Sequence, residues 1–162
     1  MHTACLSLGS NLEPERHLGA AMRALRERFG AVRVSAFYRT RAVGFEGPDF
    51  VNAAAVIDTD LDVRALDAWL HALEDAHGRD RSGPRYGDRT LDIDIVLFDD
   101  LVAEGPGRFR LPRPELRHAF VLRPLAEIAP EIVEPRSGRT LAALWAESEE
   151  RAVAMDEVAV PA

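Results

Sequence analysis

Strand-like and helix-like segments alternate along the first 98 residues in the order β-α-β-β-α-β. Apolar residues keep helical spacing in the first helical segment, for example at Leu18, Met22 and Leu25. This order is typical of the ferredoxin-like fold. We therefore expect an α+β protein with a ferredoxin-like βαββαβ core, an antiparallel sheet with helices on its faces. The expected elements are strands at Thr3–Leu8, Val32–Tyr38, Phe50–Ile57 and Leu91–Phe98, a helix from Pro14 to a cap at Gly30, and a helix at Asp62–His77.

The C-terminal part of the chain is less regular. A short strand is expected at Arg108–Leu111, and extra C-terminal helices at Ala119–Ile128 and Thr140–Ser148. A chain of 162 residues favours one domain over residues 1–162. The tail Asp156–Ala162 has little to pack against, and we expect it to fray.

The charge balance excludes some classes of partner. The formal net charge is −7 and the pI is near 5.2, which argues against a nucleic-acid binder and requires a local basic patch for any anionic ligand. The single cysteine, Cys5, excludes an internal disulfide. No secretory signal or membrane span is visible. We expect a cytoplasmic protein without a nucleic-acid or membrane partner, with a monomer as the default oligomeric state.

The strongest local signal is the run Arg89–Phe98, which contains Asp-Ile-Asp-Ile. On a strand, Asp92 and Asp94 point to one face with Cα atoms about 6.6–7 Å apart, and the apolar residues point to the other. The expected apolar face is Leu91, Ile93, Ile95 and Leu97. Two adjacent carboxylates repel each other, and a hard cation such as Mg²⁺ would compensate them. Taken alone, such a pair is more often a solvated polar face of a strand.

A basic loop leads directly into this pair. Four arginines and three glycines lie between residues 78 and 89, and guanidinium groups bind phosphate oxygens bidentately. A solvated basic loop is the alternative explanation. Cations for phosphates beside carboxylates for a metal are what phosphoryl transfer requires. The arginines are Arg79, Arg81, Arg85 and Arg89.

Two further segments offer weaker signals. Gly9-Ser10-Asn11 would form a turn close to a ligand or an ordinary strand-to-helix turn. Asn52 could bind the amide-like edge of a heterocycle and Phe50 could stack on it, although a backbone-satisfying Asn and a core Phe are the commoner roles. The five histidines show no metal-ligand spacing, and no Walker A sequence is present. In a kinase, the nucleophile would therefore be a hydroxyl of the substrate.

Taken in order, several segments resemble the hydroxymethyldihydropterin pyrophosphokinases of folate biosynthesis, from Leu6 to about Pro130. The resemblance implies a ferredoxin-like fold and transfer of pyrophosphate from ATP to the hydroxymethyl group of 6-hydroxymethyl-7,8-dihydropterin, with two Mg²⁺ ions. It implies small-molecule partners, ATP and a reduced pterin alcohol. The matching segments are Leu8–Leu12, Phe37–Thr40, Pro48–Ala54, Glu74–Arg81, Arg89–Phe98 and Phe120–Pro130.

The resemblance also implies roles for individual positions. Asp92 and Asp94 match the metal-holding aspartates, and Arg79 and Arg89 match arginines that bind the phosphates and stabilise the transferring group. The implied ATP site comprises Glu74, Arg79, Arg81, Arg89, Ile95, Arg110, Arg113 and Arg117. The implied pterin site comprises Gly9, Thr40, Arg41, Val43, Phe50, Asn52, Tyr86 and Phe120.

This chain departs from the family pattern at several of these positions. Arg41 replaces a proline, Phe50 a tyrosine, and Asp88 a proline. Arg113 stands where a phosphate-contacting histidine is expected, and the later family arginine corresponds to Arg117 or His118. These changes leave two alternatives open: a paralogue acting on a modified pterin, and a non-catalytic ferredoxin-like module that binds RNA or a regulatory ligand.

Overall fold

The computed structural model of the chain describes residues 1–40, 49–78, 90–107 and 109–160. Its main sheet has the strand order β10-β3-β4-β1-β5, with β2 paired to β4, and its strand pairs are antiparallel. The core order is that of a ferredoxin-like fold and confirms the expected α+β class. The strands are β1 (His2–Ser10), β2 (Arg33–Val34), β3 (Phe37–Thr40), β4 (Phe50–Thr59), β5 (Asp92–Phe98) and β10 (Asp156–Val158).

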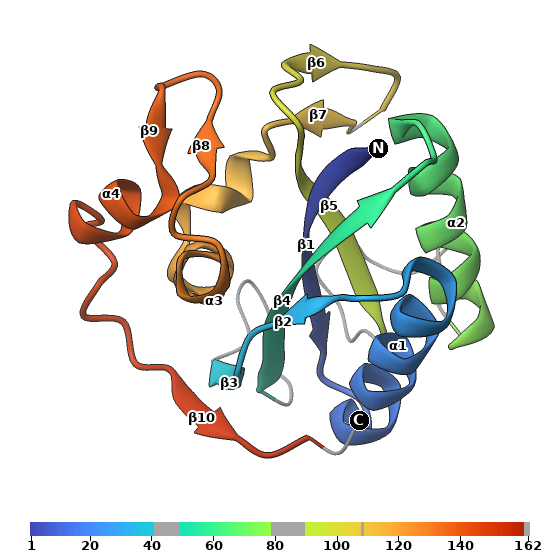
Figure 1. Ribbon diagram of the computed structural model, residues 1–162. Coiled ribbons are helices and arrows are strands. Elements are labelled where there is room, and N and C mark those ends of the chain that lie inside the picture. Colours follow the sequence, from blue (N-terminus) through green and yellow to red (C-terminus); the bar gives the residue numbers. More distant parts are fainter. Residues whose placement is uncertain (41–48, 79–89, 108, 161–162) are drawn as a thin grey trace.

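Helices cover both faces of this sheet (Figure 1). On one face lie α1 (Pro14–Phe29) and α2 (Val63–Ala76), which pack on inward residues such as Leu6, Leu8 and Ile57. On the other face lie α3 (Ala119–Ile128) and α4 (Leu141–Ala146), which pack on Cys5 and Val56. The central strands β1 and β4 are covered by helices on both faces of the sheet. Their side chains therefore alternate between two apolar clusters, one on each face.

The helix ends follow the expected chemistry. Asp62 caps α2, since its side chain accepts a hydrogen bond from the N–H of Ala65 at 2.8 Å. Gly30 ends α1 with a φ of 81°, a conformation that favours glycine.

The remaining elements are β6 (Ala103–Glu104), β7 (Arg110–Leu111), the 3-10 helix η1 (Pro114–Arg117), β8 (Val133–Glu134) and β9 (Arg139–Thr140).

Two strand expectations need correction. The segment Val32–Tyr38 forms two strands rather than one, because the Ser35 hydroxyl accepts a hydrogen bond from the N–H of Ala54 and interrupts the ladder. In β5, the register to β1 shifts between Cys5 and Leu6. Val96 is the extra residue of this β-bulge, so Leu97 packs in the α3 cluster instead of sharing a face with Ile93.

The expectation that residues 156–162 fray is wrong for Asp156–Val158. These residues form β10 and pair with β3, with Asp156 opposite Arg39 and Val158 opposite Phe37. β10 extends the sheet beyond β3 and supplies hydrogen-bond partners to a strand that would otherwise be an open edge.

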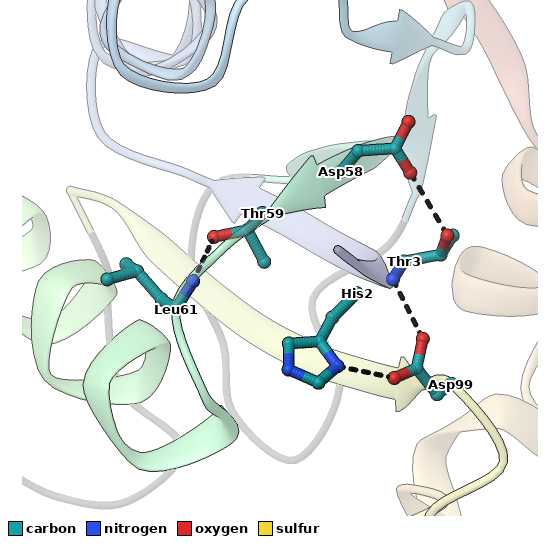
Figure 2. A network of polar contacts seen from close by, with 6 residues as sticks. All are labelled: His2, Thr3, Asp58, Thr59, Leu61 and Asp99. Atoms are coloured by element: carbon teal, nitrogen blue, oxygen red, sulfur yellow. Dashed lines mark hydrogen bonds and ion pairs between the residues drawn. The ribbon is translucent and has the colours of Figure 1, made fainter.

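A polar network links the start of β1 to the C-terminal ends of β4 and β5 (Figure 2). Asp99 accepts hydrogen bonds from the N–H of Thr3 at 2.8 Å and pairs with His2 Nδ1 at 2.7 Å. The backbone bond from Thr3, followed by the contact with His2, lowers the pKa of Asp99. The Thr3 hydroxyl also donates to Asp58 at 3.0 Å, which links β1 to β4. These contacts help hold the register on which the alignment of the candidate site depends.

No helix within the residues that the structure describes is long and apolar enough to span a membrane.

Candidate active site

The strand register aligns four predicted or neighbouring residues in a row across the sheet. Asp92 of β5 lies opposite Gly9 of β1, Gly9 lies opposite Asn52 of β4, and Asn52 lies opposite Tyr38 of β3. Cross-strand partners project to the same face. Asp94 belongs to this face too, because it is two residues from Asp92. The structure therefore brings the predicted metal carboxylates and the predicted pterin-reading amide onto one face.

The two carboxylates sit on β5, the last strand of the sheet path. Burial, followed by repulsion from Asp92, raises the pKa of Asp94 to about 8. The Asp94 side chain still keeps 36% of its surface exposed, so a cation from solvent can reach it. Because the two carboxyl groups repel each other when both are ionised, binding of a cation between them is favourable.

Glu74 of α2 supports the strand that carries the pair. Its side chain is buried, at 2% exposure, and its Oε2 accepts a hydrogen bond from the backbone N–H of Ile93 at 2.8 Å. Ile93 lies between Asp92 and Asp94, on a strand that has no further strand beyond it among the described residues. The Glu74 carboxylate thus satisfies a backbone donor that the sheet leaves open.

Arg113 is the cation that the structure brings to this pair. Its Nη2 lies 3.8 Å from Asp94 Oδ1 and 3.0 Å from Glu115 Oε2. Its backbone N–H donates to the carbonyl of Val96, which fixes the start of η1 against β5. Its Nε is buried and has no hydrogen-bond partner among the residues that the structure describes. Glu115 was not predicted from the sequence, although its place two residues after Arg113 in Arg-Pro-Glu was the available signal.

Two of the predicted pterin residues, Asn52 and Phe50, lie beside Gly9, and a third, Thr40, contacts Asn52. Asn52 is buried and donates from Nδ2 to the Thr40 hydroxyl at 2.7 Å. A Cβ on residue 9 would lie 2.8 Å from Asn52 Oδ1 and 3.8 Å from the Phe50 ring. Glycine at this position therefore leaves room beside the Asn52 amide. Phe120 is the second residue of α3, on the same side of the sheet, and its ring is stacked on His118 at 5.6 Å between centroids.

The remaining predicted ATP residues that the structure describes divide into two groups. Arg110, Arg113 and Arg117 line one groove of about 660 Å³, in which Arg136 also takes part. Ile95 is buried in the cluster under α1 and α2, so its side chain points away from the face that carries Asp94. Arg41, Val43, Arg79, Arg81, Tyr86 and Arg89 lie outside the described residues.

The donor set fits a magnesium ion. Within the described residues, no group of three or more His, Cys, Asp or Glu side chains is placed to hold a metal. Mg²⁺ does not need such a group, because it is usually bound by one or two carboxylates together with substrate phosphates and water. Asp92 and Asp94 supply two carboxylates on one face, and Asp94 is accessible.

A family model and curated relatives identify the same protein family. Residues 5–130 match the family model described as 7,8-dihydro-6-hydroxymethylpterin-pyrophosphokinase. Two curated relatives are named 2-amino-4-hydroxy-6-hydroxymethyldihydropteridine pyrophosphokinase. The one from Pseudomonas aeruginosa is 42% identical over 87% of this chain and 88% of its own length. The one from Synechocystis is 39% identical over 86% of this chain and 73% of its own length.

A solved structure shares the fold. The wild-type HPPK-DHPS of Plasmodium falciparum superimposes with a TM-score of 0.69 at 13% identity. The match covers 90% of this chain but only 44% of the solved chain, so this chain spans less than half of that protein. At this identity the likeness shows the fold alone.

Proposed function

This chain belongs to the 7,8-dihydro-6-hydroxymethylpterin-pyrophosphokinase family and is a pterin pyrophosphokinase of folate biosynthesis, and we propose that its activity depends on Mg²⁺ held by Asp92 and Asp94. The observation that supports this proposal is the cross-strand row. It aligns Asp92 with Gly9 and Asn52, so that a metal-bound triphosphate and a pterin would meet on one face of the sheet.

The proposed reaction is an in-line transfer. The hydroxymethyl oxygen of the pterin bonds to the β-phosphorus of ATP, the bond from that phosphorus to the oxygen bridging the α-phosphorus breaks, and AMP leaves as the hydroxyl proton is released. Two Mg²⁺ ions, when bound, would neutralise charge on the phosphate oxygens. The contribution of the protein is to orient the two substrates and to keep the carboxylates in register.

On the pterin side, Asn52 would donate to and accept from the amide-like edge of the ring. Its hydrogen bond to Thr40 holds the amide in one orientation, and Gly9 leaves the space beside it. Phe50 and Phe120 would stack against the ring. Arg41, Val43 and Tyr86 complete the proposed pterin set.

On the nucleotide side, the proposal assigns the phosphates to arginines. Arg79 and Arg89 would bind the transferring group, and Arg113 would bind a phosphate beside Asp94. Glu74 would act by holding β5 in place, since its carboxylate bonds the Ile93 N–H. The wider proposed ATP set is Glu74, Arg79, Arg81, Arg89, Arg110, Arg113 and Arg117. Ile95 is left out because its side chain is buried in the cluster under α1 and α2.

The identity of the nucleotide product tests this function. Incubation with Mg·ATP and 6-hydroxymethyl-7,8-dihydropterin should release AMP, whereas a phosphokinase would release ADP. Asp92→Asn and Asp94→Asn should abolish AMP release, and the control Asp100→Asn, an exposed residue in the turn after β5, should retain it. Full AMP release by both site variants, or turnover undiminished by chelating the metal, would refute the assigned metal site.

We also propose that the protein acts as a cytoplasmic monomer on small molecules, without a nucleic-acid or membrane partner. The carboxylates on its sheet face would repel the phosphates of RNA. Light scattering at enzyme concentrations above those used for assay would reveal a dimer. Fractionation of the producing cells would reveal membrane association.

A further inference from the structure

The Asp94–Arg113 pair has the geometry of a weak contact. The separation of 3.8 Å between Nη2 and Oδ1 is well beyond the 2.7–2.9 Å of a charge-assisted hydrogen bond. Both side chains keep contact with solvent, at 36% exposure for Asp94 and 21% for Arg113. The same guanidinium is held more closely by Glu115, at 3.0 Å. Arg113 therefore lies near Asp94 but forms no close ion pair with it.

Arg113 also carries a donor that lacks an acceptor. Its Nε is buried and makes no hydrogen bond within the described part of the chain. Burying such a donor costs free energy unless an acceptor is bound. The guanidinium has five N–H groups in a fixed fork, and its geometry matches two oxygens of a phosphate. A phosphate beside Asp94 would supply the missing acceptor.

We propose that Arg113 is an exchangeable counter-ion. When Asp94 is ionised in the ligand-free protein, Arg113 offsets its charge, and in the bound state Arg113 leaves that carboxylate to the metal and binds a phosphate oxygen of the nucleotide. This inference rests on the proposed function, because it requires the metal and the nucleotide to meet at Asp94. Glu115 holds the guanidinium within reach of both partners throughout the exchange.

The exchange couples the two ligands. A metal ion that arrives alone must displace Arg113 from Asp94 with no new partner for the guanidinium. A metal ion that arrives with nucleotide phosphates offers Arg113 a replacement. Metal and nucleotide should therefore bind more tightly together than separately, and Arg113 should add to the coupling that the metal–phosphate contact itself provides.

Binding measurements on Arg113→Ala test the proposal without relying on turnover. Mn²⁺ is a suitable metal probe because carboxylate sites accept it like Mg²⁺, and electron paramagnetic resonance counts the free ion. Without Arg113, Mn²⁺ alone should bind about two- to fivefold more tightly, as expected for loss of a solvent-exposed ion pair. A non-hydrolysable ATP analogue with Mg²⁺ should bind about tenfold or more weakly, because a charge-assisted phosphate contact is gone.

Two matched variants separate the exchange from general charge and folding effects. Arg113→Lys keeps the positive charge but loses Nε, so Mn²⁺ affinity should stay near the wild-type value while analogue affinity falls. Arg136→Ala removes a positive charge from the same groove, and Mn²⁺ affinity should not change. Arg113→Lys also tests the donor if Arg113→Ala does not fold.

A shift of Mn²⁺ and analogue affinity in the same direction in Arg113→Ala would overturn the exchange, as would an equal gain in Mn²⁺ affinity in Arg136→Ala. Failure of the wild-type protein to bind the analogue with Mg²⁺ would instead overturn the proposed function itself. The two failures are distinguishable because only the second involves the unmodified protein.

Discussion

The buried carboxylate of Glu74 accepts a hydrogen bond from the backbone N–H of Ile93 at 2.8 Å, at the midpoint between the two site aspartates. A side chain of α2 thereby completes the outer edge of β5. The contact couples the packing of a helix to the alignment of Asp92 and Asp94. It gives Glu74 a positioning role that is separable from any contact with nucleotide.

Two substitutions of Glu74 should therefore separate the effect of its hydrogen-bond acceptor on stability from the effect of its negative charge. Glu74→Ala leaves the Ile93 N–H buried without a partner and should lower the free energy of unfolding by about 1–3 kcal/mol. Glu74→Gln keeps an acceptor and removes a negative charge beside Asp94, so it should remain closer to wild-type stability. Denaturant unfolding measures both. Equal losses in the two variants would mean that the charge, not the hydrogen bond, stabilises the strand.

Gly9→Ala should damage pterin binding more than folding. The added Cβ would lie 2.8 Å from Asn52 Oδ1, so the amide must turn and lose its hydrogen bond to Thr40. Pterin affinity, measured by fluorescence titration, should fall about tenfold, as expected when a positioned polar contact is lost. The double variant Gly9→Ala/Asn52→Ala relieves the clash and should unfold like Asn52→Ala alone. Unchanged pterin affinity in Gly9→Ala would contradict the placement of the pterin beside Asn52.

The raised pKa of Asp94 predicts a pH-dependent stability in the metal-free protein. Its pKa is about 8 in the fold against an ordinary 3.8, so between these values the folded state holds a proton that the unfolded chain has released. Stability from this group is present at low pH and is lost as pH rises from about 4 through about 8. Thermal unfolding at several pH values in this window should show a steeper fall for wild type than for Asp94→Asn.

Metal reverses this trend, because Mg²⁺ binds the deprotonated carboxylate and displaces the proton. The stabilisation that Mg²⁺ confers should grow with pH over the same window. An identical pH dependence of wild type and Asp94→Asn without metal would show that burial does not raise the Asp94 pKa.

Deleting residues 156–162 should destabilise the protein, because β10 supplies the outer pairing of β3. Each hydrogen bond lost is worth about 0.5–1.5 kcal/mol, so the deletion should cost a few kcal/mol in total. The effect should reach the site, since β3 carries Thr40, which bonds Asn52. Unchanged thermal stability after the deletion would show that the segment frays, as expected from its having little to pack against.

Much of the fold was predictable from local pattern. The helices at Pro14–Phe29 and Val63–Ala76 match their apolar spacing and caps, and the period of two in Asp-Ile-Asp-Ile placed both aspartates on one face. The bulge at Val96 was not predictable, because an inserted residue leaves no mark in an apolar run. The pairing of β10 with β3 was also missed, since sheet partners distant in sequence are chosen by tertiary packing.

The sequence named candidate site residues but not the contacts between them. The sequence placed Asp92, Asp94 and Asn52 among the site residues, and the register brings them to one face. The sequence also singled out Arg113 as a departure from the family pattern. Its position between Asp94 and Glu115 depends on how η1 begins against β5, which only the folded backbone determines.

The most direct test of the account is a calorimetric titration with a non-hydrolysable ATP analogue, with and without Mg²⁺, followed by 6-hydroxymethyl-7,8-dihydropterin. If Asp92 and Asp94 hold the metal that receives the triphosphate, the analogue binds tightly only with Mg²⁺, the pterin then binds to that complex, and Asp92→Asn/Asp94→Asn removes the Mg²⁺ dependence. Analogue binding of equal strength with and without Mg²⁺ in the wild-type protein would contradict it.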